Sequence, residues 1–270
     1  MNELRRWALG VEYDGSAFCG WQWQAQKRSV QATLEKALSV IAQHRVTLMC
    51  AGRTDARVHA LEQVVHFDSP APRLASAWLL GGNSHLPADV RITWVKPAAA
   101  EFHARYSAIA RLYRYVIFNR PVRSALLYNR ATWCYLPIDA QLMHSAAQAL
   151  VGSHDFSSFR AAGCQSKSPY RQLHFIDVRR EGEQVIIELA ANAFLHHMVR
   201  NIAGVLMDIG AGKQPLQWTE HLLTVKDRTQ ATQTAPPEGL YLAAVFYPAQ
   251  YGINAHQLFA KLPADAQRFD

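Results

Sequence analysis

The sequence predicts an α+β fold made of two halves, and three observations point to this class. Several segments place apolar residues at every second position, which is typical of strands. Other segments repeat apolar residues at helical spacing behind the capping residues Ser29 and Asp139. Both halves of the chain show strands with two interposed helices. We therefore expect two α+β halves that share or abut an antiparallel sheet.

The N-terminal half begins with an alternating segment, residues 5–13, and we expect a strand there. Ser29 is expected to cap a helix that extends to about His44. The remaining expected elements are strands at 46–50 and 62–68, a helix near 73–80 and a strand at 90–96.

The C-terminal half repeats this pattern. Asp139 is expected to cap a helix that Gly152 closes, and Asn192 a helix that carries Leu195 to Ile209 on one face. The remaining expected elements are a strand at 111–119, a hairpin of 171–180 with 184–191, a helix near 216–225 and a closing strand at 240–247. We predict a boundary near 100–108, with halves at 1–105 and 106–247 and a surface tail at 248–270.

The charge favours a polyanionic partner. The chain has 270 residues, with 28 Lys and Arg against 21 Asp and Glu, a net charge of +7 and a pI near 9.4. Nucleic acid is the first candidate for such a balance. Four cysteines form no C-x-x-C pair and no zinc pattern. We found neither a signal peptide nor an apolar run of about 18 residues, so we expect a cytoplasmic protein with no membrane partner.

A short loop, AGRTDARVHA at 51–60, is the most informative segment. It places Asp55 between Arg53 and Arg57, and the flanking segments are predicted strands. A carboxylate among guanidinium groups at strand ends is typical of a working, ionised group. The alternative is a surface Asp–Arg ion pair in a loop.

Other motifs are less specific. His196 and His197 are adjacent, so on a helix they would point about 100° apart and could not bind one ion. We found no zinc-protease motif, serine-hydrolase elbow or phosphate-binding loop, so neither a metal nor a nucleotide cofactor is predicted. Arg200 lies at the edge of an apolar helix stripe, either as a solvated residue or as a half-buried partner for a carboxylate.

Aromatic residues in two segments are candidates for a binding site. Tyr113 and Tyr115 share a strand face beside Arg111, where they could stack on bases or simply belong to the core. The loop EYDGSAFCGWQWQ at 12–24 is rich in glycine and tryptophan and suggests a site, but no chemistry follows from it.

With these residues in hand, the chain resembles the tRNA pseudouridine synthase A family across nearly all of 5–247. Nine segments occur in the family's order: EYDG with GWQ (12–15, 20–22), SVQ (29–31), AGRTDA-VHA (51–60), N..LP.DV (83–90), FHAR (102–105), R.YRYVIFN (111–119), ANAFLHHMVRNI.G (191–204), KDR (226–228) and TAP..GLYL (234–242).

The resemblance implies a fold and an activity. The family fold is two ferredoxin-like halves that form an extended antiparallel sheet with a central cleft. Its members convert uridine to pseudouridine at positions 38, 39 and 40 in the anticodon arm of tRNA, act as homodimers and use no cofactor. In this chain Asp55 would be the nucleophile or base, and Arg200 would pair with it. Tyr113 would stack on the uracil, and Arg53 would assist base flipping.

One position departs from the family pattern. The family usually has glycine after G-R-T-D-A, and this chain has Arg57. If the position needs a positive φ, arginine costs about 1 kcal/mol or more there. Arg57 could instead contact an RNA phosphate.

Two other functions are compatible with these residues. A nucleoside hydrolase could use Asp55 near a ribose and end in attack by water, releasing free uracil. An RNA-binding module or tRNA chaperone without catalysis is the second, because Arg57 lies in the loop that would carry catalysis.

Overall fold

The computed structural model describes residues 3–253, so the expected tail lies outside the described residues from 254 onward. The chain divides into two compact units. The N-terminal unit comprises the described residues up to Ile109 together with those from Tyr241, and the C-terminal unit comprises Ala110–Leu240. Within the described range, no helix is long and apolar enough to cross a bilayer. The predicted mixed α+β class is confirmed.

The N-terminal unit contains a sheet with the strand order β4-β1-β3-β10, and β2 pairs with β3. Strand β1 is antiparallel to both β3 and β4, whereas β10 pairs with β3 in parallel. The strands are β1 (Arg5–Tyr13), β2 (Met49–Cys50), β3 (His59–Ser69), β4 (Val90–Ala98) and β10 (Leu240–Phe246). The expected closing strand of the second half therefore pairs inside the N-terminal unit.

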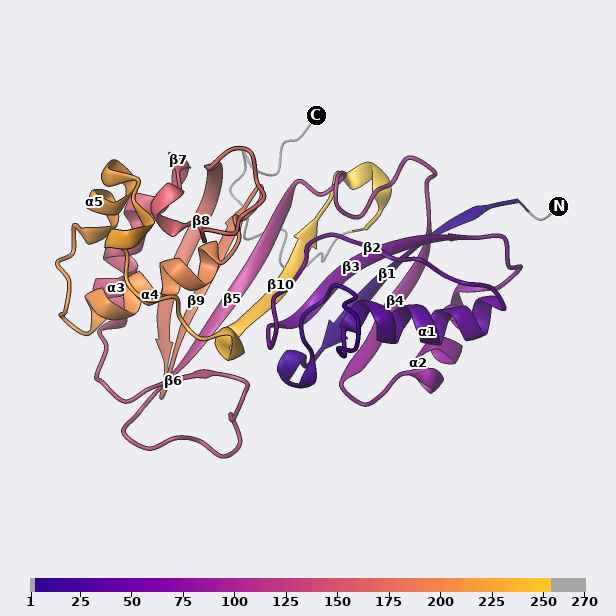
Figure 1. The fold of residues 1–270 in the computed structure, drawn as a ribbon, viewed down its shortest axis with the longest axis horizontal. Coiled ribbons are helices and arrows are strands. Elements are labelled where there is room, and N and C mark those ends of the chain that lie inside the picture. Colours follow the sequence, from indigo (N-terminus) through magenta and orange to yellow (C-terminus); the bar gives the residue numbers. More distant parts are fainter. Residues whose placement is uncertain (1–2, 254–270) are drawn as a thin grey trace. The chain divides into compact units, whose positions relative to one another are not determined.

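Two helices cover one face of this sheet (Figure 1). Helix α1 (Val30–Ala42) begins where predicted, and the Ser29 side chain accepts a hydrogen bond from Ala32 N. The helix expected near 73–80 is a π-helical turn, Ala77–Gly81, which leads into α2 (Gly82–His85). Trp78 from this turn packs against the sheet, with its ring centroid 6.1 Å from that of Trp7 and 5.0 Å from that of Phe67.

The other face of this sheet is covered by the segments after β4 and β10. Phe102 and Ala104 are fully buried. Ala104 N donates to His66 Nδ1 at 3.1 Å, and Tyr247 donates its hydroxyl to Ala104 O at 2.7 Å. The Phe102 ring also meets Tyr251 at 5.3 Å, so residues 248–251, expected as a surface appendage, pack on this unit.

The buried His66 makes stability depend on pH. Burial, His103 and Arg6 lower the pKa of His66 to about 4, whereas an unfolded histidine titrates near pH 6.5. The unfolded chain therefore takes up this proton first, and the stability is complete only above about pH 6.5. We expect His66 to lower the free energy of unfolding by about 2 kcal/mol between pH 7 and pH 5. Urea unfolding of wild type and His66→Gln at both pH values checks this, and equal pH dependence in the two proteins would contradict it.

The C-terminal unit has the strand order β5-β9-β8-β7, with β6 parallel to β5. The hairpin of β8 and β9 turns at Gly182, which has a φ of +59°, as the sequence predicted. The strands are β5 (Ala110–Asn119), β6 (Thr132–Cys134), β7 (Gly152–Asp155), β8 (Tyr170–Glu181) and β9 (Gln184–Ala191). The helices are α3 (Ala140–Ala147), α4 (Met198–Gly210) and α5 (Trp218–Val225).

One face of this second sheet carries a buried carboxylate. Glu188 on β9 is 2% exposed. Its Oε1 accepts from Arg114 Nη2 at 2.7 Å, and its Oε2 accepts from Arg179 Nη1 at 2.9 Å. Both carboxylate oxygens are thus engaged by guanidinium groups from the neighbouring strands, which offsets the cost of burying the charge.

Several predicted boundaries differ from the structure. The strands β6 and β7 are short and were not predicted, and α3 ends at Ala147 before Gly152 opens β7. The prediction that Asn192 caps a helix is wrong. The Asn192 side chain accepts from Gln172 N and Ala193 N, which anchors the turn after β9. Helix α4 begins only at Met198, after His197 at a φ of +61°.

Candidate active site

The loop with Asp55 connects β2 to β3 in the N-terminal unit. Val58 N donates to Asp55 O at 3.2 Å and closes a turn just before β3 begins. The Asp55 side chain is half-buried, whereas Arg53 and Arg57 are exposed. This arrangement leaves a carboxylate accessible to a ligand while its backbone is tied into the sheet.

Two side chains that sequence reasoning missed hold this loop. Tyr13 at the end of β1 shares a 2.7 Å hydrogen bond with Thr54 Oγ1. The fully buried Gln63 on β3 brackets Gly52: its Nε2 donates to Gly52 O at 2.5 Å, and its Oε1 accepts from Gly52 N at 3.4 Å. A polar residue on the inward face of an apolar strand was the signal that could have identified Gln63.

The glycine-rich loop after β1 packs directly on the Asp55 loop. Trp21 N donates to Thr54 O at 3.0 Å. Gly20 has a φ of +93°, and a Cβ there would lie 2.8 Å from Thr54 O. Glycine is required for this approach. The loop at 12–24, to which no chemistry was assigned, thus supports the backbone next to Asp55.

Arg57 has a φ of +66°, so the condition for backbone strain at this position is met. Its N–H donates to Phe18 O at 3.2 Å, which holds the residue in this conformation. A residue with a Cβ is disfavoured in this left-handed backbone conformation, whereas glycine adopts it without strain.

We expect Arg57→Gly to raise the free energy of unfolding by up to about 1 kcal/mol and to leave the salt dependence of tRNA binding unchanged. Urea unfolding and tRNA titrations at several salt concentrations measure both quantities. A salt slope of log K lower by about one, with unchanged stability, would show instead that Arg57 contacts a phosphate.

Two of the predicted site residues belong to the C-terminal unit. Tyr113 lies on β5, and its ring meets the ring of Phe194 edge-on, with centroids 5.0 Å apart. Arg200 lies in the first turn of α4 and is half-buried. Its Nε donates to Ala235 O at 2.8 Å, and Ala235 N donates to Arg200 O at 3.1 Å. These bonds hold the backbone at Arg200 and the Nε of its guanidinium group.

Tyr115, the other tyrosine on that strand face, belongs to the core. It is fully buried, shares a 2.6 Å hydrogen bond with Thr132 Oγ1 and donates to Pro236 O at 2.8 Å. Burial raises the pKa of its hydroxyl. Of the two interpretations of Tyr115, the structural one is confirmed.

The histidine pair lies before α4, so the expectation that the two rings diverge on a helix is wrong. The centroids of His196 and His197 lie 3.9 Å apart. Ala161 N donates to His196 O at 3.0 Å, which ties this turn to the loop after β7. The absence of a metal cofactor stays a prediction.

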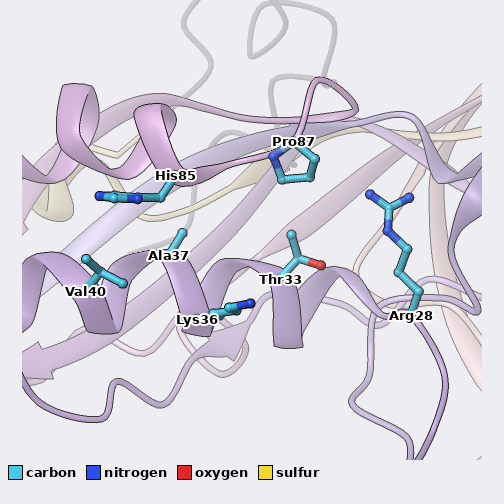
Figure 2. Close-up of a pocket in the computed structure, with 7 residues that line it drawn as sticks. All are labelled: Arg28, Thr33, Lys36, Ala37, Val40, His85 and Pro87. Carbon is cyan, nitrogen blue, oxygen red and sulfur yellow. The ribbon is translucent and has the colours of Figure 1, made fainter.

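A shallow groove of about 360 Å³ lies on the helical side of the N-terminal unit. Arg28 and α1 residues line one wall, and His85 and Pro87 line the other (Figure 2). Arg28 binds Asp89 with two hydrogen bonds of 2.7 and 2.8 Å. None of the predicted site residues lines this groove, so it is distinct from the Asp55 loop.

Comparison with known proteins identifies the class. A family model for tRNA pseudouridine synthase matches residues 10–107 and 146–248. These ranges include the Asp55 loop and Arg200, whereas Tyr113 lies outside them. The fold is therefore the pseudouridine synthase fold.

Individual relatives show which family of pseudouridine synthases the chain belongs to. The tRNA pseudouridine synthase A of Methylococcus capsulatus is 59% identical over 98% of this chain and 97% of its own length. The enzymes of the same name from Hydrogenovibrio crunogenus and Cronobacter sakazakii are 54% and 56% identical over 90% of the chain, and 93% and 90% of theirs. The chain belongs to the tRNA pseudouridine synthase A family, which is a family of isomerases.

Proposed function

We propose that this chain converts uridine to pseudouridine at positions 38, 39 and 40 of the anticodon arm of tRNA. The observation that carries the proposal is the G-R-T-D-A segment with Asp55 half-buried in a loop that Tyr13, Gln63 and Gly20 hold in place. A carboxylate in a preorganised loop suits chemistry at a single atom of a bound nucleotide.

The reaction is an isomerisation. The C1′–N1 bond of the target uridine breaks, the uracil turns, and a C1′–C5 bond forms. The C5 proton leaves and N1 gains one, so atoms and electrons balance without a co-substrate. The target must first leave the base stack, which costs a few kcal/mol.

Asp55 is the residue that acts on the ribose. An ionised carboxylate either attacks C1′ as a nucleophile or removes a proton from C2′ as a base. Both routes detach the uracil and let it rejoin through C5. Asp55 performs either role with the same side chain.

The other roles follow from the resemblance and from local geometry. Arg200 pairs with the Asp55 carboxylate, and a guanidinium suits this because it binds both carboxylate oxygens. Tyr113 stacks on the uracil and retains it while it is detached. Its position against Phe194 supports this, because the neighbouring ring limits how far the tyrosine can turn. Arg53 is exposed and assists base flipping.

The substrate is recognised through tRNA shape and backbone. An enzyme that modifies three neighbouring positions cannot depend on one fixed base sequence around its target. The net charge of +7 suits contact with phosphates. We propose that the enzyme acts in the cytoplasm as a homodimer, as the resemblance implies.

Incubation with an unmodified tRNA transcript tests this proposal against its two alternatives. Pseudouridine, detected by carbodiimide labelling or by mass spectrometry, supports the isomerase. Release of free uracil would instead identify a nucleoside hydrolase. Binding with neither product would identify an RNA-binding module.

A further inference from the structure

A tight turn in the N-terminal unit, residues 103–107, presents an aromatic ring and a cation that the proposed chemistry does not use. Tyr106 is 76% exposed, and Arg105 is exposed beside it. The Arg105 guanidinium carbon lies 5.6 Å from the centroid of the Tyr106 ring.

The base of this turn is anchored in the core of the unit. Phe102 is fully buried, and its ring centroid lies 5.1 Å from that of Tyr247. Ala104 donates its N–H to His66, and Tyr247 donates its hydroxyl to Ala104 O. Hydrogen bonds from Ala104 to His66 and from Tyr247 to Ala104 thus hold the turn against the core of the unit.

The turn itself is closed by His103. Its Nδ1 accepts from the N–H groups of Arg105 and Tyr106 at 3.1 and 3.2 Å. Ser107 N donates to His103 O at 2.9 Å, and Ser107 Oγ accepts from His103 N at 3.0 Å. Burial and the Arg6 guanidinium lower the pKa of His103, which suits a neutral ring that accepts both bonds.

The Tyr106 ring is oriented before any ligand arrives. Its centroid lies 4.3 Å from that of the His103 ring, with 31° between the two planes. One face of the tyrosine is therefore backed by the imidazole. An aromatic ring that is both exposed and fixed loses little conformational entropy when a base stacks on it.

The turn lies beside the Asp55 loop within the same unit. Ala104 N in the turn donates to His66 Nδ1 at 3.1 Å, and His66 on β3 pairs with Met49 on β2. The turn therefore lies next to the end of β2, after which the Asp55 loop begins. Burial raises the pKa of the Cys50 thiol to about 12, and the guanidinium groups of Arg53 and Arg105 both lower it, in agreement with this placement.

We propose that Arg105 and Tyr106 form a second RNA contact: the Tyr106 ring stacks on an unpaired base of the tRNA, and Arg105 binds the adjoining phosphate. An exposed aromatic ring next to a guanidinium is the arrangement that binds unstacked nucleotides without reading their sequence. This inference rests on the proposed function, because it assumes a tRNA substrate. It adds a contact that holds the RNA while the target nucleotide is flipped.

The test compares binding of an unmodified tRNA transcript by wild type, Tyr106→Ala and Tyr106→Phe. Stacking predicts that Tyr106→Ala raises Kd and KM by about 5- to 50-fold at unchanged kcat, and that Tyr106→Phe restores both to within about twofold. Arg105→Ala should weaken binding and lower the salt slope of log K by about one, whereas Arg105→Lys should keep the slope. Tyr128→Ala is the matched control, because Tyr128 is 67% exposed in the other unit.

Three results would overturn the inference. The first is wild-type tRNA affinity in Tyr106→Ala, and the second is failure of Tyr106→Phe to restore binding. The third is a changed oligomeric state with unchanged tRNA affinity, which would make the surface a protein interface. The proposed function is judged separately by Asp55: if Asp55→Ala is inactive while Tyr106→Ala binds normally, only this inference fails.

Discussion

Asp55→Asn and Asp55→Ala are expected to lose turnover by at least about 10³-fold while tRNA affinity stays within a few-fold. The physical reason is that in the proposed reaction one carboxylate performs the chemistry at the ribose, whereas many cationic groups contribute to binding. The measurement is pseudouridine formation in single-turnover assays, together with the Kd for the same transcript.

A matched control for Asp55 is Glu183→Gln, which removes an exposed carboxylate that pairs with Arg120. This variant should keep wild-type activity, because surface ion pairs contribute little. Thermal unfolding of all three variants shows whether the loop still folds. Appreciable pseudouridine formation by Asp55→Ala would contradict the role given to this residue.

Arg200→Ala is expected to lower kcat by about 10²- to 10³-fold, and Arg200→Lys by less. The lysine keeps the positive charge, but an ammonium cannot bind both oxygens of a carboxylate as a guanidinium does. Both variants also lose the hydrogen bond from Arg200 Nε to Ala235 O. Thermal unfolding is therefore measured alongside single-turnover rates.

Arg123→Ala controls for Arg200, because Arg123 lies over the Trp133 ring in the same unit and has no role in the proposed chemistry. It should keep wild-type kcat. A double-mutant cycle of Arg200→Ala with Asp55→Asn tests the proposed pair. Losses that multiply, with no coupling between the two changes, would show that the two residues act independently.

The elements that local sequence patterns determine were predicted well. Helix α1 follows from Ser29 and its apolar spacing, and the β8–β9 hairpin follows from Gly182 between two alternating segments. In both cases the residues that decide the conformation are close together in the sequence. Arg57 has a positive φ, which the sequence analysis stated only as the condition under which arginine would be strained there.

The features that depend on distant partners were missed. Asn192 has the side chain of a helix cap, but Gln172 N competes for it from β8. Strand β10 pairs in parallel with β3, about 180 residues earlier in the sequence, and no local pattern indicates this partner. Gln63 holds Gly52 through hydrogen bonds that only the folded loop creates.

The sequence identified the candidate site residues, but it did not identify the side chains that hold them in place. Asp55 was identified from its place between two arginines, and the family resemblance added Arg53, Tyr113 and Arg200. Their roles stay predictions. The structure adds what the sequence could not give, namely the groups that hold the Asp55 loop and the turn that presents Tyr106.

The most direct test of the central claim is a map of pseudouridine in an unmodified tRNA transcript after incubation with the enzyme. A companion transcript carries cytidine at positions 38, 39 and 40. We predict pseudouridine at uridines within these three positions of the first transcript and none in the companion. Pseudouridine elsewhere in the tRNA, or equal modification of both transcripts, would contradict the proposed function.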